Sequence, residues 1–210
     1  MNRRQMLRIA GGGFIAAATV SSLTGCDSSM PPEAIAAWNP PADSLDIRRW
    51  VLSHAILAPH SHNLQSWLVD LSVPDEITLF LDRSRLLPET DPFSRQMMMS
   101  QGTFLELLDQ AARQRGHRAD IALFPEGVFA PTTVDARPTA RIVLVPDASV
   151  VPDPLFAHVF ARRTNREAYE AREPAASALQ AIADSVRFPG MRVGSVLASQ
   201  TDAVARHRRI

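Results

Sequence analysis

The chain has 210 residues, of which 46% are hydrophobic and 21% charged, which is enough for a folded domain with a sizeable core. Its 22 basic and 22 acidic residues give a net charge of zero, so the global charge does not favour nucleic acid or an anionic membrane surface as a partner. The single cysteine, Cys26, excludes a disulfide within the chain.

The first 26 residues have the form of an export signal. Arg3 and Arg4 begin a twin-arginine pattern, followed by an apolar run over residues 9–23 that is short and weakly apolar for a membrane span. The run ends in Leu23-Thr24-Gly25-Cys26, which looks like a lipobox. We therefore expect twin-arginine export, lipidation of Cys26, and anchoring on the extracytoplasmic (periplasmic) face of the cell membrane. A plain signal or an uncleaved anchor with an incidental cysteine is the alternative.

Residues 27–43 are rich in Pro and Ser and predict a tether. Asp43 or Ser44 then suits the cap of a helix whose apolar side chains recur at roughly helical spacing. His54 lies on that apolar stripe, and we interpret it as a core histidine rather than a ligand. The region from 44 to 150 is expected to form one structural half and residues 151–210 the beginning of a second.

A polar loop follows the first helix, between Pro59 and Trp67. Its residues 60–63 are all small or polar, and the segment after them reads as a buried strand. A polar loop between a core helix and a core strand is where a rigid scaffold usually presents functional groups.

The remaining pattern alternates strands and helices. Strands are expected at 67–71, 77–81, 121–124, 140–145 and 191–197. A long core helix is expected from Pro92 to Gly116, with shorter helices at 153–162, at 175–186 and from Ser199. In the long helix we interpret the run Met97-Met98-Met99 as core filling in preference to a soft wall around a cofactor.

A second candidate site is the segment Arg162-Arg163-Thr164-Asn165-Arg166. In an extended turn, the guanidinium groups of Arg162 and Arg166 point the same way as the Thr164 hydroxyl, an arrangement suited to binding a phosphate. The alternative is a helix capping box formed by Thr164 and Glu167, with the arginines solvated.

Both motifs resemble those of the flavin-dependent nitroreductase family. Its loop pattern P-S-x-x-N-x-Q-P-W is matched here by Pro59, Ser61, Asn63, Gln65 and Trp67, whereas His60 stands where the family usually has Ser and Ser66 replaces the second Pro. The arginine segment resembles the R-x-S-x-R/K segment with which the family holds the phosphate of flavin mononucleotide (FMN). Residues 82–102 resemble the stress-associated, single-chain branch.

The resemblance implies an α+β fold, with three layers in which helices pack on a mixed sheet. It also implies a single-chain pseudo-dimer whose second half is incomplete, so we expect a C-terminally truncated chain. Pro59, Ser61 and Asn63 are expected to face the flavin, and Arg162, Thr164 and Arg166 its phosphate, across one shared polar cleft.

The function implied is an FMN-dependent oxidoreductase that takes electrons from NAD(P)H or another donor and reduces a nitro- or quinone-like acceptor. A flavin-binding or flavin-sequestering protein without turnover is the alternative, because reduced nicotinamides are not expected outside the cytoplasm. A zinc site at His60 and His62 lacks the Cys or carboxylate ligands that would complete it. A serine hydrolase lacks the G-x-S-x-G turn.

Overall fold

The computed structural model describes residues 31–170, 172–186 and 191–209. The chain divides into two compact units between Arg162 and Arg163. The predicted export signal and lipobox, including Cys26, lie outside the described residues. None of the helices in the described ranges is long and apolar enough to cross a membrane.

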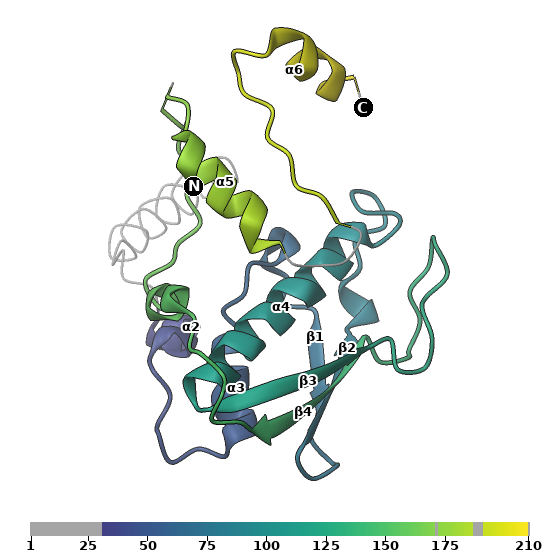
Figure 1. Ribbon diagram of the computed structural model, residues 1–210. Helices are drawn as coiled ribbons and strands as arrows, with labels where there is room; N and C mark the ends of the chain where they lie inside the picture. The colour runs from purple at the N-terminus through teal and green to yellow at the C-terminus, as the bar shows by residue number, and fades with distance from the viewer. Residues whose placement is uncertain (1–30, 171, 187–190, 210) are drawn as a thin grey trace, which may run out of the picture. The chain divides into compact units, whose positions relative to one another are not determined.

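The first unit is built on a four-stranded sheet in the order β1-β2-β4-β3 (Figure 1). Its strands are β1 (Trp67–Asp70), β2 (Glu76–Leu81), β3 (His117–Leu123) and β4 (Ala140–Pro146). Together with the helices that cover it, this sheet confirms the predicted α+β class. The resemblance implies a mixed sheet, but the described strands pair only antiparallel. The connections β1–β2 and β3–β4 each return the chain along its neighbour, and β4 also runs antiparallel to β2.

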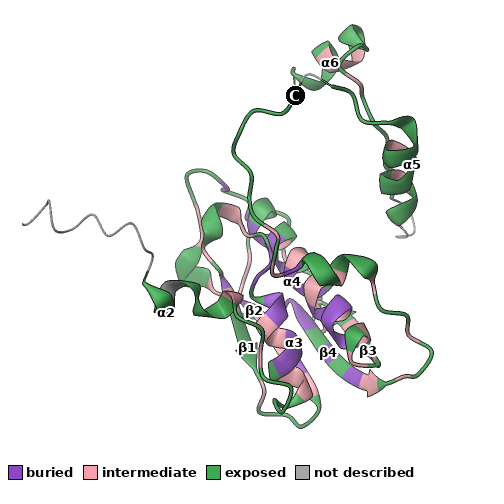
Figure 2. Ribbon diagram, turned by 90° about the vertical axis from the view of Figure 1, so that its left-hand side faces the viewer, coloured by how far each residue is buried: buried purple, intermediate pink, exposed green. Residues whose placement is uncertain are grey.

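One face of the sheet carries the core. In β2, Ile77, Leu79 and Leu81 are buried while the residues between them are half-buried, the period-two pattern of a strand with one covered face. Helices α3 (Ile47–Ala55) and α4 (Arg95–Gln114) pack against each other, and their buried side chains join this face in one core cluster (Figure 2). α4 is therefore the central core helix that the sequence predicts.

The ends of α4 are set by Asp91 and Gly116. The Asp91 carboxylate accepts the backbone N–H groups of Arg95 and Met97 at 2.8 and 3.0 Å, so the helix begins at Arg95 and the predicted start at Pro92 is wrong. Gly116, with φ of 66°, ends it as predicted, because the left-handed conformation after a helix favours glycine.

The start of α3 also differs from the prediction. The stretch interpreted as a tether contains α2 (Pro32–Ile35) and the 3-10 turn η1 (Ala36–Trp38). The cap of α3 is Asp46, whose carboxylate accepts the Arg48 N–H at 3.1 Å, so the predicted cap at residues 43–44 is wrong.

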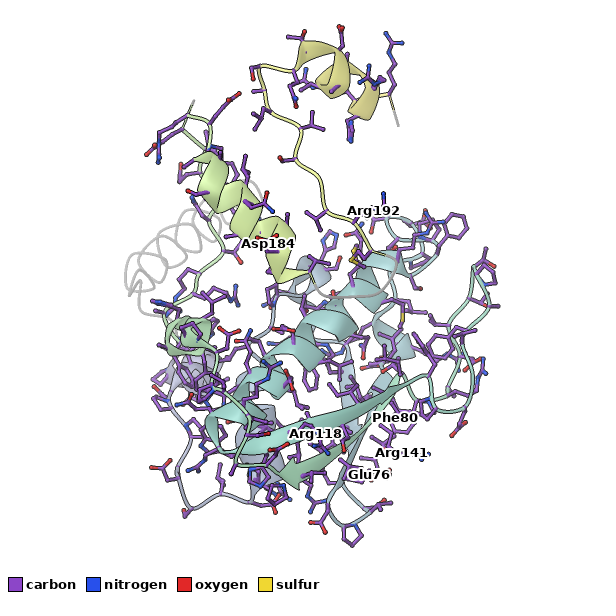
Figure 3. All side chains as sticks on the ribbon, in the orientation of Figure 1. Glu76, Phe80, Arg118, Arg141, Asp184 and Arg192 are labelled. Atoms are coloured by element: carbon purple, nitrogen blue, oxygen red, sulfur yellow. The ribbon has the colours of Figure 1, made fainter. Side chains whose placement is uncertain are left out.

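The opposite face of the sheet is more polar. Glu76 of β2 lies beside Arg141 of β4, with 3.4 Å between Oε1 and Nε (Figure 3). On the edge strand β3, Arg118 pairs with Asp120, which raises the pKa of Arg118 and lowers the pKa of Asp120. Exposed pairs of this kind add little stability, but charges on an edge strand discourage pairing with another chain.

The second unit contains α5 (Ala176–Ser185) and α6 (Thr201–His207), which agree with the predicted helices. The strand predicted at 191–197 is wrong, because no described strand pairs with it and a lone strand leaves its backbone groups without partners. In the first unit, a shorter 3-10 helix, η4 (Pro154–His158), takes the place of the helix predicted at 153–162. The first half and second half predicted at 44–150 and 151–210 remain a prediction.

Candidate functional site

The loop 59–67 leaves α3 and enters β1, with a 3-10 turn, η2 (Ser61–Asn63), in its middle. His62, Asn63 and Gln65 have φ values of 52°, 53° and 51°, in the left-handed region that side chains with a Cβ rarely adopt. Backbone strain of this kind persists only where the surrounding structure over-determines it, and it concentrates at functional sites.

One stripe of α4 holds both ends of the loop. Thr103 Oγ1 donates to the Pro59 carbonyl at 2.7 Å, and Ser100 Oγ accepts the Ser61 N–H at 3.1 Å. The indole N–H of Trp67 donates to the Ser100 carbonyl at 3.2 Å. These bonds fix the loop to a core helix, which explains how its strained backbone is maintained.

His60 and Ser66, near the two ends of the loop, are joined by hydrogen bonds. His60 Nδ1 donates to the Ser61 carbonyl at 2.8 Å, because a carbonyl oxygen can only accept. In the neutral ring, Nε2 is then an acceptor, and it lies 2.7 Å from Ser66 Oγ and 3.2 Å from the Ser66 backbone N. The two positions at which this chain departs from the nitroreductase pattern are therefore hydrogen-bonded to each other.

Beneath the loop, Gln101 of α4 connects it to Thr139, which directly precedes β4 at the same end of the sheet. Gln101 Nε2 donates to the Ser66 carbonyl at 3.2 Å, and its Oε1 lies 3.2 Å from the Thr139 hydroxyl. Gln101 is only 2% exposed, so both contacts are shielded from water. On the outer side, Arg85 Nη1 donates to the Leu64 carbonyl at 2.6 Å.

The tip of the loop presents polar groups. His62, Asn63 and Gln65 are exposed, and the Asn63 N–H is already bonded to the His60 carbonyl. The Ser61 hydroxyl donates to Gln96 Oε1 at 3.2 Å. Of the predicted flavin-facing residues, Asn63 thus exposes an amide side chain, while Pro59 and Ser61 are anchored to α4.

Arg162 lies beside the segment that leads into this loop. Its Nη2 donates to the Leu57 carbonyl at 2.6 Å, and its guanidinium lies 5.8 Å from the centre of the Trp38 ring. Leu57 precedes Pro59 by two residues. The structure therefore brings the first predicted phosphate ligand close to the start of the loop, with one of its donors bound to the protein.

The other two predicted phosphate ligands, Thr164 and Arg166, belong to the second unit and are exposed. Thr164 does not cap a helix, because no helix begins there. Instead the Asn165 side chain accepts the Glu167 N–H at 2.9 Å in a local turn. This outcome removes the capping-box alternative, while the shared cleft remains a prediction.

His54 is confirmed as a core histidine. It is 2% exposed, its Nδ1 donates to the Trp50 carbonyl at 2.9 Å, and its ring lies 4.2 Å from the Trp50 ring and 5.0 Å from the Phe156 ring, measured between centroids. Burial lowers the pKa of His54, and the nearby Arg115 charge lowers it further, against the opposing bond to Trp50. Among the described residues no three His, Cys, Asp or Glu side chains gather to hold a metal ion.

Sequence reasoning missed a pocket at the amino-terminal end of α4. It has a volume of about 470 Å³ and is lined by Phe93, which precedes α4, and by residues of α4 and of the β3–β4 loop. The run Met97-Met98-Met99 was the part of the sequence that could have indicated the pocket. Met97 fills the core as interpreted, but Met99 is 64% exposed and lines the pocket together with the half-buried Met98. A one-dimensional pattern does not separate these three neighbours, because each points in a different direction around the helix.

Among known proteins, the chain matches no protein-family profile. It is similar to two proteins of Mycobacterium tuberculosis, "Putative NAD(P)H nitroreductase Rv3131" of strain H37Rv and "Putative NAD(P)H nitroreductase MT3217" of strain CDC 1551. Each is 31% identical to this chain over 149 residues, which cover 70% of the chain and 40% of the relative. The chain thus spans about two fifths of the length of these relatives.

Proposed function

We propose that this protein is an FMN-dependent oxidoreductase of the nitroreductase family, which passes electrons from a nicotinamide donor to a nitro- or quinone-like acceptor. The observation that carries the proposal is the loop 59–67, which has the family's residues at five positions, is anchored to α4, and exposes Asn63 on a strained backbone. The names of the two relatives support both the reaction class and the electron donor.

The residues present fit a flavin mononucleotide. The exposed Asn63 amide offers donors and an acceptor, which suits the polar edge of a flavin ring. Arg162, Thr164 and Arg166 would hold the phosphate through charge-assisted hydrogen bonds. When bound, the flavin supplies the redox chemistry, and the chain's own residues bind and orient it.

Purified protein titrated with FMN and with riboflavin tests this assignment. Arg166→Ala should weaken FMN binding about tenfold to a hundredfold, the equivalent of about 1.5–3 kcal/mol for a bond to a charged group, and should leave riboflavin binding unchanged. Arg163→Ala is the matched control. Arg162 is a poorer test site, because its side chain also holds the Leu57 carbonyl. Equal FMN affinities for both variants and the wild type would contradict the phosphate assignment.

Storage of flavin without turnover is the second candidate function, and the twin-arginine pattern in the sequence, which predicts export, is the observation that favours it. Reduced nicotinamides are cytoplasmic, so an exported enzyme would lack its usual donor. Adding NAD(P)H to the flavin-loaded protein separates the two functions. Prompt bleaching, followed by recovery of the yellow colour on adding a quinone, identifies the enzyme, whereas an unreactive yellow protein identifies storage.

The location is part of the same proposal: export by the twin-arginine route and attachment through a lipid on Cys26 to the extracytoplasmic face of the membrane. Cys26→Ser should move the protein from the membrane fraction to the soluble fraction, while the matched variant Ser22→Ala, outside the lipobox, should stay with the membrane. Retention of the Cys26→Ser protein in the membrane would identify an uncleaved helical anchor instead.

A further inference from the structure

The pocket at the amino-terminal end of α4 takes no part in the proposed flavin site. It lies between the first turns of this helix and the loop that joins β3 to β4, which extends beyond that end of the helix in Figure 1. Its volume of about 470 Å³ falls in the range of small-molecule sites. None of the residues that line the pocket belongs to the loop 59–67, although Thr103, which holds the Pro59 carbonyl, lies one turn after Met99 on the same face of α4.

The walls of the pocket are apolar and open to solvent. Phe93, Met99 and Val128 are 45%, 64% and 72% exposed, and all three line it. Large apolar side chains gathered on a surface mark a binding site more often than scattered ones do. Aromatic rings and thioethers contact flat aromatic ligands favourably, through their faces, edges and polarizable sulfur.

The wall formed by the β3–β4 loop is rigid. Arg137 Nη1 donates to the Glu126 carbonyl at 2.9 Å, Nη2 donates to the Val128 carbonyl at 3.3 Å, and the same guanidinium pairs with Asp135 at 2.7 Å. Phe124 enters the loop with φ of 48°, an uncommon conformation for an aromatic residue, and its ring packs edge-on against Phe129 at 5.6 Å. These contacts hold the loop wall of the pocket in place.

Its charge comes from Arg95. This guanidinium lies over the Phe93 ring, 5.2 Å from its centre, and none of the ion pairs between described residues involves it. Asp91 already occupies the N–H groups of Arg95 and Met97, so the side chain of Arg95, and not the end of the helix, is the group available to an anion. The charge of Arg137, by contrast, is balanced by Asp135.

We propose that this pocket binds a flat aromatic monoanion, such as an aromatic carboxylate, with its ring against Met99 and Phe129 and its anionic group on Arg95. Apolar walls of limited volume select the ring, and a single available cation selects the charge. No residue of the proposed flavin loop lines this site, so binding of the monoanion is expected whether or not the protein binds FMN.

Calorimetric titration of the full chain with 2-naphthoate and with 2-naphthalenemethanol tests the charge requirement. The carboxylate should bind about tenfold more tightly than the alcohol, and Arg95→Gln should remove this difference. Arg49→Gln, at an exposed arginine of α3, is the matched control and should preserve it. Equal affinities for the two ligands in the wild type, or an unchanged preference in Arg95→Gln, would overturn the proposal.

Methyl NMR of methionine-labelled protein tests the location. On adding 2-naphthoate, ring currents should shift the methyl signals of Met98 and Met99, while Met97, which is fully buried, should not move and reports an intact core. Met99→Glu should abolish binding without changing the Met97 signal. Shifts at Met97 alone would overturn the assignment. So would ligand-free shifts of Met98 and Met99 that depend on protein concentration, because a second copy of the chain would then cover the pocket.

Discussion

Two loops flank the amino-terminal half of α4, and they are made rigid by different chemistry. The loop 59–67 is fastened mainly by neutral hydrogen bonds, among them the bond from the Ser61 N–H to Ser100 and the pairing of His60 with Ser66, with one further bond from Arg85 to the Leu64 carbonyl. The β3–β4 loop is fastened by one cation, Arg137, which binds backbone carbonyls and the Asp135 carboxylate. Both contain residues with positive φ that are not glycine.

The contacts that hold each loop in place differ from the side chains at its tip, which set what it can bind. Each loop is held in advance of any ligand, so neither needs to lose much conformational freedom on binding. What differs is the tip: polar amides around Asn63 in one, and apolar Val128 and Phe129 in the other. One helix thus supports two surfaces of different chemistry, linked through the buried Gln101.

Removing the Gln101 side chain should lower the free energy of unfolding more than any other change proposed below. Gln101→Ala leaves a cavity and deprives the Ser66 carbonyl and the Thr139 hydroxyl of a buried partner, so we expect the free energy of unfolding to fall by about 3 kcal/mol. Urea unfolding followed by tryptophan fluorescence measures it. Gln114→Ala, at an exposed position of the same helix, is the control and should change stability by less than about 0.5 kcal/mol.

A substitution confined to the loop 59–67 should lower the free energy of unfolding by less than Gln101→Ala does. His60→Ala removes the acceptor of the Ser66 N–H, and since Ser66 is fully buried we expect a loss of about 2 kcal/mol. His62→Ala, at an exposed neighbour, should be close to neutral. In a double-mutant cycle, His60→Ala and Ser66→Ala should show a coupling energy of about 1 kcal/mol. Additive effects would mean that the two side chains do not act as a pair.

Acid should weaken the helix that leads into the first loop. Because burial lowers the pKa of His54 in the folded protein, the unfolded chain binds a proton more readily than the folded one as the pH falls below the ordinary histidine pKa of 6.5. Stability should therefore fall as the pH drops below 6.5, by at most about 1.4 kcal/mol per pH unit, until the folded-state pKa is reached. His54→Met should flatten this part of the profile, and parallel profiles for variant and wild type would contradict the assignment.

The smallest effect is expected from relieving strain at the tip. Gln65 is exposed and has φ of 51°, so Gln65→Gly should stabilise the protein by about 0.5 kcal/mol, the gain from relieved strain exceeding the added freedom of the unfolded chain. Thermal unfolding measures the shift. A loss of stability would show that the Gln65 side chain makes contacts that outweigh the strain of its backbone.

Much of the first unit was predictable because its elements are locally encoded. The alternation in β2 and the apolar stripe of α4 follow from burial on one face, and Gly116 suits the left-handed end of a helix. The strand expected at 191–197 failed for the opposite reason, because a strand also needs a partner, which the residues of the strand do not specify. The loop 59–67 was found by its motif, and the pocket was missed because its lining comes from separate segments.

The sequence by itself determined the fold class, the location of the polar loop and the residues at its tip, because periodicity, helix caps and a short motif are properties of neighbouring residues. Only the tertiary structure decided that His60 and Ser66 bond to each other, that Arg162 reaches Leu57, and that Met99 lines a pocket while Met97 fills the core. Contacts between segments far apart in the chain, and the direction in which each helical side chain points, exist only once α3, α4 and the sheet have packed together.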